Sequence, residues 1–255
     1  MNSTGQIRSI CIIGSGPSGI ASYIALAYQR PAGLNSITLI SSDEIENQRS
    51  FGAKAEDLLA NTSASITSID PFNESDYIEW LEEKKGYNTD SYDSVFTPRS
   101  FIGEYISDRT KRFAKILNDA GIETRFVIDT VFEVTVDLIV KVSSGDSYKF
   151  DAVICATGSE YGNPWPNFNG EKNYFPSPSF LGKEVNAKSA LVAGSNLSAI
   201  DSSLRILRKN PGAKVLMASK SGCLPAVRRV LTSKSDCQTS GHLYCENNIR
   251  RLKKV

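Results

Sequence analysis

Runs of apolar residues alternate along this chain with stretches in which apolar positions return every three or four residues. Ser9–Ile13 is the first such run, and its unbroken apolar character is typical of a parallel strand buried on both faces. Ser18–Gln29 carries apolar residues on one helical face, and Pro31 and Gly33 end that helix. Ser36–Ile40 is a second strand. The pattern therefore predicts a complete β-α-β unit at the start of the chain.

The chain becomes more polar after this unit. Residues 41–72 have weak periodicity, which is typical of an insertion that carries active-site loops. A helix is predicted over Ser75–Lys85, where Ser75 and Asp76 suit the N-cap. A longer helix is predicted over Ile102–Ala120. Two helices therefore follow the insertion before strand-forming residues return.

Strand-forming residues dominate the next segment. Ile122–Val142 is rich in β-branched residues and Phe, and the turn Ser143–Asp146 follows it, so we expect a small antiparallel meander. Ala152–Ala156 is a further buried strand, and Tyr161–Pro178 is a linker rich in Pro, Asn and Gly. A second β-α-β unit is predicted from a strand, a helix and a strand at Ser189–Ala193, Ser198–Lys209 and Lys214–Ala218.

A glycine-rich turn joins the first strand to the first helix. It reads, in order, Gly14, Ser15, Gly16, Pro17, Ser18 and Gly19, which fits G-x-G-x-x-G. The first glycine permits a tight turn, the middle one lets backbone approach a pyrophosphate, and the third allows close helix–strand packing. The helix N-terminus then offers free N–H groups to the phosphates. A turn without a ligand is the alternative, but the surrounding strands and helix supply the context that the motif needs.

Further segments point to a known class of protein. Asp151–Gly158 is a hydrophobic strand that ends in Ala-Thr-Gly, at the edge where doubly wound sheets bind ligands. Together with the glycine-rich start and the meander, it resembles the flavoproteins with two dinucleotide-binding domains, which include flavin monooxygenases, thioredoxin reductases and N-hydroxylating enzymes. Leu58–Asn61, Asp76–Leu81 and Pro98–Ile106 resemble the "LLN", "WL" and "PR-x-x-x-GEYL" elements of a family of FAD/NAD(P)-binding proteins.

This resemblance implies a fold. The fold class is α/β, with a Rossmann-like FAD domain that has a three-layer ββα arrangement and an antiparallel β meander, followed by a partial second Rossmann-like NAD(P) domain. The FAD domain is expected at residues 1–160, with an insertion at about 41–100. A linker is expected at 161–188 and the partial NAD(P)-binding domain at 189–255.

The resemblance also implies where FAD lies. The turn Gly14–Gly19 is expected to hold its pyrophosphate, and the backbone at Thr130 and Val131 its adenine. Asn61 and Arg99 are expected near the isoalloxazine and the substrate. The flavin side of the pyrophosphate is expected to pass Ala156, Thr157 and Gly158.

Two of the resembling segments have structural alternatives. Arg99 could instead form a structural salt bridge, for example to Glu104, because buried arginine pairs are often structural. Trp80 is expected to belong to the core rather than to serve as a stacking platform.

The adenosine ribose is the weak point of the predicted FAD site. The second strand of such a unit should end in Glu or Asp, which bonds the ribose hydroxyls. Here Ser41 and Ser42 follow Ile40. Ser41 offers one hydroxyl, and Asp43 or Glu44 is the alternative contact. Losing a charge-assisted hydrogen bond costs roughly 1.5–3 kcal/mol, so we expect weakened FAD binding.

The second β-α-β unit carries a degraded fingerprint. Gly194–Asp201 resembles the NAD(P)H site of the family, but Asn196 replaces the middle glycine, where its side chain could crowd a pyrophosphate. Ala199 is an accepted third residue. Lys220 follows the next strand and favours the 2′-phosphate of NADP over the free hydroxyl of NAD. The predicted NADPH contacts are Gly194, Ser195, Asn196 and Lys220. A scaffold that once bound a nicotinamide cofactor is the alternative.

Composition narrows the range of partners. The 255 residues carry 29 basic and 28 acidic side chains, a net charge of +1, so neither nucleic acid nor a membrane surface is expected as a partner. No apolar run has the length of a membrane span, and the polar N-terminus does not have the pattern of a signal peptide. A small-molecule substrate and a cytoplasmic location are therefore expected.

The chain has five cysteines and one histidine. Cys11 and Cys155 lie in apolar runs and are expected to be small buried residues. Cys223, Cys237, His242 and Cys245 supply four zinc-ligand types, but their spacing lacks the close Cys pairs of common zinc modules. Unpaired, reduced thiols and no bound metal are therefore expected.

Two functions remain open. The first is an FAD-dependent NAD(P)H oxidoreductase, monooxygenase-like, that acts on a small molecule. The second is a non-catalytic FAD- or NADP-binding subunit or sensor derived from such an enzyme. No Ser-His-Asp, Cys-His or Cys-x-x-Cys arrangement is evident, so no catalytic side chain is assigned. Related chains continue beyond this point, so we expect a fragment, a partner subunit that completes the flavin site, or a short form without catalysis.

Overall fold

A four-stranded parallel sheet, in the order β3-β2-β1-β7, organises the first part of the chain. The computed structural model describes residues 6–45, 50–52, 58–158, 165–175 and 186–225. Contacts divide the chain into two units, residues 1–160 and 161–255. The strands of the parallel sheet are β1 (Ser9–Ile13), β2 (Ser36–Ser41), β3 (Glu123–Ile128) and β7 (Ala152–Cys155). Ile12 of β1 pairs with Leu39 of β2 and with Ile154 of β7, so β1 lies inside the sheet.

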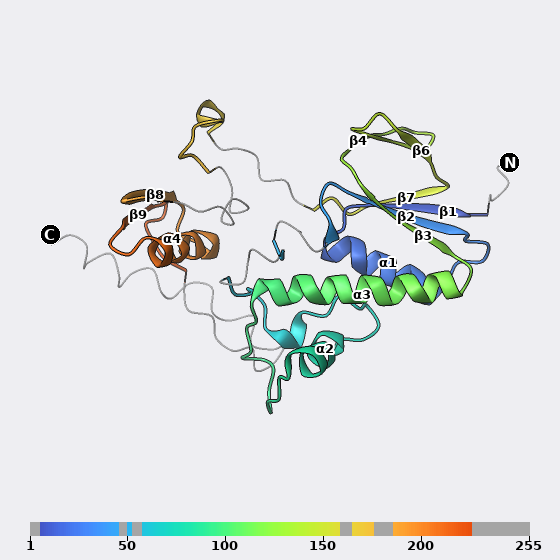
Figure 1. Ribbon diagram of the computed structural model, residues 1–255, viewed down its shortest axis with the longest axis horizontal. Coiled ribbons are helices and arrows are strands. Elements are labelled where there is room, and N and C mark those ends of the chain that lie inside the picture. Colours follow the sequence, from blue (N-terminus) through green and yellow to red (C-terminus); the bar gives the residue numbers. More distant parts are fainter. Residues whose placement is uncertain (1–5, 46–49, 53–57, 159–164, 176–185, 226–255) are drawn as a thin grey trace. The chain divides into compact units, whose positions relative to one another are not determined.

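Helices cover one face of this sheet (Figure 1). The helices of the first unit are α1 (Pro17–Gln29), η3 (Ala64–Ile66, a 3-10 turn), α2 (Asp76–Lys85) and α3 (Arg99–Asp119). Because alternate residues of a strand point to opposite faces, Ile10 and Ile12 of β1 belong to the cluster on the helix side. Ile24 of α1 and Ile106 of α3 lie in the same cluster and are fully buried.

A small antiparallel sheet covers the opposite face of the parallel sheet (Figure 1). Its strands are β4 (Val131–Val134), β5 (Ile139–Val142) and β6 (Ser147–Lys149). Cys11 and Ile13 of β1 pack in one cluster with Val140 and Val142 of β5. The first unit therefore has three layers, helices, parallel sheet and meander, which confirms the predicted ββα arrangement.

The meander is shorter than the sequence predicts. The run Ile122–Val142 was expected to be antiparallel throughout, but β3 pairs in parallel with β2, with Ser36 opposite Glu123. Only β4–β6 form the antiparallel sheet. The prediction was wrong here because β-branched residues indicate a strand without specifying the partner to which it pairs.

The structure agrees with the predicted start of the shorter helix after the insertion but moves the start of the longer one. The longer helix begins at Arg99 instead of Ile102, and Pro98 holds its N-cap position. Ser75 holds the N-cap position of α2, but its side chain makes no capping bond. Asp76, the other suggested cap, is 2% exposed. Its carboxylate forms a buried ion pair with Arg109, described below, and does not cap the helix.

The second unit contains the predicted β-α-β elements. They are β8 (Ser189–Ala193), α4 (Leu197–Lys209) and β9 (Lys214–Ala218), after a 3-10 turn η4 (Pro166–Phe168). β8 and β9 pair in parallel, with Leu191 opposite Leu216. Both strands alternate between exposed and half-buried residues, unlike the buried strands β1 and β2.

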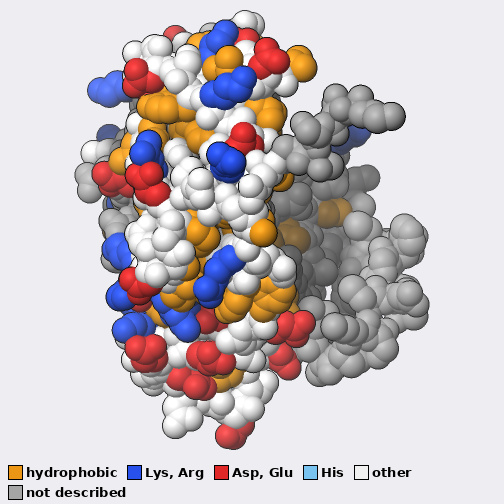
Figure 2. Space-filling model, turned by 90° about the vertical axis from the view of Figure 1, so that its right-hand side faces the viewer, with side chains coloured by type: hydrophobic (Ala, Val, Ile, Leu, Met, Phe, Trp, Pro, Cys, Tyr) orange, Lys and Arg blue, Asp and Glu red, His pale blue; other side chains and the backbone are white. Residues whose placement is uncertain are grey.

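Four further observations concern the cysteines, the possible metal ligands, the hydropathy of the helices and the surface charges. Cys11 is fully buried as predicted, but Cys155 is exposed, because it is the last residue of an edge strand. The zinc alternative requires Cys237, His242 and Cys245, which lie outside the described residues. Within the described ranges no group of three or more His, Cys, Asp or Glu could hold a metal. None of the helices described there is long and apolar enough to cross a membrane. Figure 2 shows basic and acidic side chains interspersed among apolar ones over most of one face.

Candidate dinucleotide-binding site

The glycine-rich turn packs tightly between β1, α1 and the end of β7. The N–H of Gly14 donates to the carbonyl of Ile40, 2.8 Å away, which ties the turn to the end of β2. Gly14 has a φ of +105°, and a Cβ there would lie 2.3 Å from the carbonyl oxygen of Ala156. A Cβ on Gly19 would lie 1.9 Å from the Gly14 carbonyl oxygen. The first and third glycines are therefore required by the fold itself.

The middle glycine has a different surrounding. A Cβ on Gly16 would meet nothing within 4 Å, and its φ of −65° is open to any residue. The first bonded N–H of α1 is that of Ile20, which donates to the Gly16 carbonyl (3.0 Å). The N–H groups of Ser18 and Gly19 therefore lack helical acceptors and lie at the positive end of the helix dipole. Open space beside such donors fits a pyrophosphate.

The ends of β2 and β3 form the next part of the site. Ser15 Oγ donates to Ser41 Oγ over 2.8 Å, and the N–H of Asp129 donates to the Ser41 carbonyl over 2.9 Å. The predicted adenine contacts, Thr130 and Val131, therefore come directly after a residue bonded to Ser41. Asp43, a suggested substitute for the ribose acid, accepts a hydrogen bond from the Ser42 hydroxyl (3.1 Å).

Asp129 is a residue that sequence reasoning missed. Its carboxylate accepts the N–H of Thr130 (2.6 Å) and the N–H of Ser144 (3.3 Å). Hydrogen bonding from the Ser144 side chain, followed by these backbone groups, lowers the pKa of Asp129. The residue was overlooked because β3 was assigned to the meander. Its position after a parallel strand, at the ligand-binding edge, was the available signal.

The third predicted segment follows β7. The N–H of Ala156 donates to the Ile13 carbonyl (2.8 Å), so the chain continues alongside β1 beyond the strand. Gly158 has a φ of +72°, a conformation that favours glycine. Since the Ala156 carbonyl also closes over Gly14, the structure brings Ala156 and Thr157 against the glycine-rich turn.

Asn61 and Arg99 lie together, as parts of two segments that pair. The N–H of Arg99 donates to the Leu58 carbonyl (2.8 Å), and its Nε donates to the Leu59 carbonyl (3.0 Å). Arg99 Nη2 lies 3.5 Å from Asn61 Oδ1. Glu104, the suggested salt-bridge partner of Arg99, pairs instead with Lys85 (2.6 Å), and the described residues show no ion pair between Arg99 and Glu104. A structural role for Arg99 stays an alternative. The expected proximity of Asn61 and Arg99 to flavin or substrate stays a prediction.

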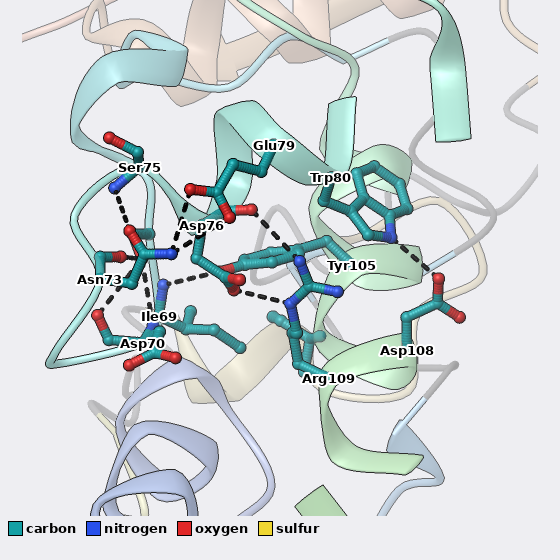
Figure 3. Close-up of polar contacts among 12 residues, drawn as sticks. Ile69, Asp70, Asn73, Ser75, Asp76, Glu79, Trp80, Tyr105, Asp108 and Arg109 are labelled. Atoms are coloured by element: carbon teal, nitrogen blue, oxygen red, sulfur yellow. Dashed lines mark hydrogen bonds and ion pairs between the residues drawn. The ribbon is translucent and has the colours of Figure 1, made fainter. Parts of the chain in front are cut away.

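A buried polar network fastens α2 to α3 (Figure 3). Arg109 Nε and the Tyr105 hydroxyl both donate to Asp76 Oδ2, over 2.7 Å and 2.6 Å. Burial, followed by the hydrogen bond to Asp76, raises the pKa of Tyr105 well above its usual range. Trp80 is 1% exposed, and its Nε1 donates to Asp108 Oδ2 (2.8 Å), which confirms its core role. This network holds the helix that carries Arg99 at its N-terminus.

The second unit repeats the backbone of the first turn. The N–H of Gly194 donates to the Ala218 carbonyl (2.7 Å), and Ser195 Oγ donates to Ser219 Oγ (2.9 Å). Asn196 is exposed, holds the N-cap position of α4 and makes no side-chain capping bond. Lys220, the predicted contact of the 2′-phosphate, is exposed just beyond β9. The described residues therefore present both predicted fingerprints at the carboxyl ends of parallel strands.

These features define the class of protein as an α/β protein with Rossmann-like dinucleotide-binding units. The family described as FAD-NAD(P)-binding matches residues 11–160, more than half of the chain. The protein belongs to this family, as the sequence resemblance predicts. An uncharacterized protein of Escherichia coli (strain K12), YdhS, is 26% identical over 222 residues, which cover 78% of this chain and 39% of the relative. The chain thus spans about two fifths of the length of that curated relative.

Solved structures with a similar fold include two monooxygenases and a hydroxylase. The FAD-bound cadaverine monooxygenase DfoA of Erwinia amylovora is 17% identical, with a TM-score of 0.58 over 84% of this chain and 52% of that one. Ornithine hydroxylase PvdA of Pseudomonas aeruginosa is 13% identical, with a TM-score of 0.57 over 82% and 54%. An NADP+-bound cyclohexanone monooxygenase from Rhodococcus sp. Phi1 is 16% identical, with a TM-score of 0.53 over 82% and 38%.

Proposed function

We propose that this protein is an FAD-dependent NAD(P)H oxidoreductase, monooxygenase-like, that acts on a small molecule. The observation that carries the proposal is the turn at Gly16, where an open space faces the unbonded N–H groups of Ser18 and Gly19. Membership of the FAD-NAD(P)-binding family supports it. Three structures of its fold are monooxygenases or hydroxylases, and one of them, DfoA, is bound to FAD.

The residues of the first unit divide the task of holding FAD. The N–H groups behind Gly16 bind the pyrophosphate, Ser41 contacts the ribose, and the backbone at Val131 contacts the adenine. The flavin side of the pyrophosphate runs along Ala156, Thr157 and Gly158. When bound, FAD supplies the hydride-accepting and oxygen-activating chemistry. The Asn61–Arg99 pair, 3.5 Å apart, orients the flavin ring or the substrate through its amide and guanidinium groups.

The second unit, in this proposal, takes NADPH as the reductant. Gly194, Ser195 and the first turn of α4 face its pyrophosphate, and Lys220 neutralises the 2′-phosphate. A partner subunit or further segment that completes the flavin site belongs to the proposal as well. The support comes from the relatives' lengths, since the chain spans only 39% of its curated relative and 52% of the cadaverine monooxygenase.

A non-catalytic FAD- or NADP-binding subunit or sensor is the second candidate. Asn196 favours it, because its backbone (φ −82°, ψ −177°) follows that of Gly16 (φ −65°, ψ 177°). At Gly16 a Cβ would point into open space, and at position 196 a side chain is present. A chain that binds FAD but responds poorly to NADPH would fit this candidate.

The visible spectrum of the purified protein tests both candidates. A yellow protein that NADPH bleaches without oxygen supports the oxidoreductase. A yellow protein that NADPH leaves unbleached favours the sensor, and a colourless protein that takes up no added FAD contradicts both FAD proposals.

Gly16→Val locates the site. Since a Cβ at Gly16 meets no protein atom within 4 Å and φ is unstrained, the variant should fold normally yet lose FAD by more than about a hundredfold in affinity. Ser22→Val, with the same side chain further along α1, is the matched control and should retain FAD. Unchanged FAD content in Gly16→Val would contradict the pyrophosphate site.

A further inference from the structure

A serine pair occupies the same place in each β-α-β unit. Ser15 Oγ donates to Ser41 Oγ over 2.8 Å, and Ser195 Oγ donates to Ser219 Oγ over 2.9 Å. Each donor follows the first glycine of its turn, and each acceptor lies at the end of the second strand. The two turns differ at their middle and third positions, yet the pair and its donor direction recur. The recurrence argues for a role beyond the packing of one loop.

In the first pair, the hydroxyl proton of Ser41 is available to bond a ligand. Ser15 is 3% exposed, whereas Ser41 is half-buried at the ligand-binding edge. Because one lone pair of Ser41 Oγ receives the Ser15 proton, the Ser41 proton must point in another direction. Among the hydrogen bonds between described residues, none has the Ser41 hydroxyl as its donor. A ligand at the end of β2 would therefore meet Ser41 as a hydrogen-bond donor.

We propose that Ser15 is a positioning residue, which holds Ser41 so that its hydroxyl donates to the 2′-oxygen of the adenosine ribose; this rests on the proposed FAD site. The chemistry is the reverse of the usual one, in which a carboxylate accepts hydrogen bonds from the ribose hydroxyls. A neutral donor bonds a ribose oxygen without requiring its proton. One neutral hydrogen bond thus recognises the ribose and raises the affinity for FAD by about threefold to tenfold.

The test compares FAD with its 2′-deoxyadenosine analogue, by quenching of flavin fluorescence on binding to each variant. The wild-type protein should prefer FAD by about threefold to tenfold. Ser41→Ala should bring this ratio close to one. Ser15→Ala should lower it by at least half, although the Ser15 side chain bonds to Ser41 and not to the ribose. In the Ser41→Ala background, Ser15→Ala should change nothing further, as expected for a residue that acts through its partner.

The ratio separates this inference from general damage, because both ligands are measured on the same protein. Ser22→Ala, which also removes a serine hydroxyl from the first unit, should keep the wild-type ratio. Should Ser15→Ala fold poorly, Ser15→Cys retains the volume with a weaker donor and should give an intermediate ratio.

Two outcomes would overturn the role of Ser15. An unchanged ratio in Ser41→Ala shows that the pair does not read the 2′ position, and an unchanged ratio in Ser15→Ala alone removes its positioning role. If the wild-type protein binds neither ligand, or Gly16→Val still binds FAD, it is the proposed FAD site that fails instead.

Discussion

The two β-α-β units share a backbone design but differ in how far their strands are enclosed. In both, the N–H of the first glycine donates to the carbonyl at the end of the second strand, from Gly14 to Ile40 and from Gly194 to Ala218. β1 and β2 are buried along nearly their whole length, whereas β8 and β9 alternate between half-buried and exposed. The same turn geometry therefore forms in strands that differ in exposure.

The difference at the turn itself follows from packing. In the first unit β7 passes the turn, so that the Ala156 carbonyl closes on Gly14. In the second unit a Cβ on Gly194 would meet only the Ala199 methyl, at 3.5 Å. Glycine is thus required at the third position of the first turn, Gly19, while the third position of the second turn accommodates Ala199. A degraded fingerprint in sequence can therefore retain the fold of the turn and lose only its space for phosphate.

Exchanging the third residue of each turn should have the largest effect. Gly19→Ala places a Cβ 1.9 Å from the Gly14 carbonyl oxygen, a backbone atom that cannot move without opening β1 from α1. We expect it to destabilise the first unit by about 3 kcal/mol. The reverse change, Ala199→Gly, should cost about 1 to 2 kcal/mol, from helix propensity and one lost methyl contact.

Hydrogen exchange followed by mass spectrometry measures this asymmetry, because it resolves peptides from each unit. Protection should fall mainly in β1 and α1 for Gly19→Ala, and more weakly in β8 and α4 for Ala199→Gly. Equal losses in the two variants would show that the units pack their helices alike, contrary to the comparison drawn above.

The middle position should affect binding more than stability. Asn196→Gly removes a side chain from the space in which a pyrophosphate would lie, and α4 loses no capping bond because Asn196 makes none. We expect NADPH to bind about tenfold more tightly, equivalent to about 1.4 kcal/mol. Titration of NADPH fluorescence measures the change. Asn196→Ala should give a smaller gain. No gain in either variant would contradict the proposal that the second unit binds NADPH.

The elements of both units could be predicted from the sequence, because buried parallel strands and helices have different apolar periods. β1 and β8 were predicted with the bounds that the structure shows. Partner choice could not be predicted, since β3 has the composition of a meander strand but pairs with β2. The exposure of Cys155 could not be predicted for the same reason, because edge strands and central strands have similar sequence patterns.

The candidate site could be predicted only where it depends on backbone. Glycine spacing located the turn, because a missing Cβ is visible in a sequence. The Ser15–Ser41 bond joins residues 26 positions apart, and no local pattern announces it. Asp76 was predicted as a helix cap but forms a buried ion pair with Arg109, 33 positions away. Side-chain pairing over such separations depends on the tertiary fold.

The smallest expected effect concerns the side-chain hydrogen bonds that hold the chain at the start of each unit's first strand; each such contact is called a tie below. In the first unit, Asp151 Oδ2 accepts the N–H groups of Arg8 and Ser9, both at 2.9 Å. In the second, the neutral amide oxygen of Asn210 accepts the N–H of Ala187 at 3.1 Å. One tie is charged and the other is not, so only the first should depend on pH.

The sign follows from the pKa of Asp151, which is lowered from its ordinary 3.8, first by the Arg8 N–H and then by Ser9. A lowered pKa in the folded state stabilises the fold above about pH 4, and this contribution is lost as the pH falls through the folded value. Asp151→Asn should therefore reduce the unfolding temperature at pH 7, and the difference from wild type should shrink between pH 5 and 3. Asn210→Ala should reduce it by an amount that stays constant over that range. Because Asp151 is exposed, both shifts should be small, and a difference for Asp151→Asn that did not change with pH would mean that its charge contributes nothing to the tie.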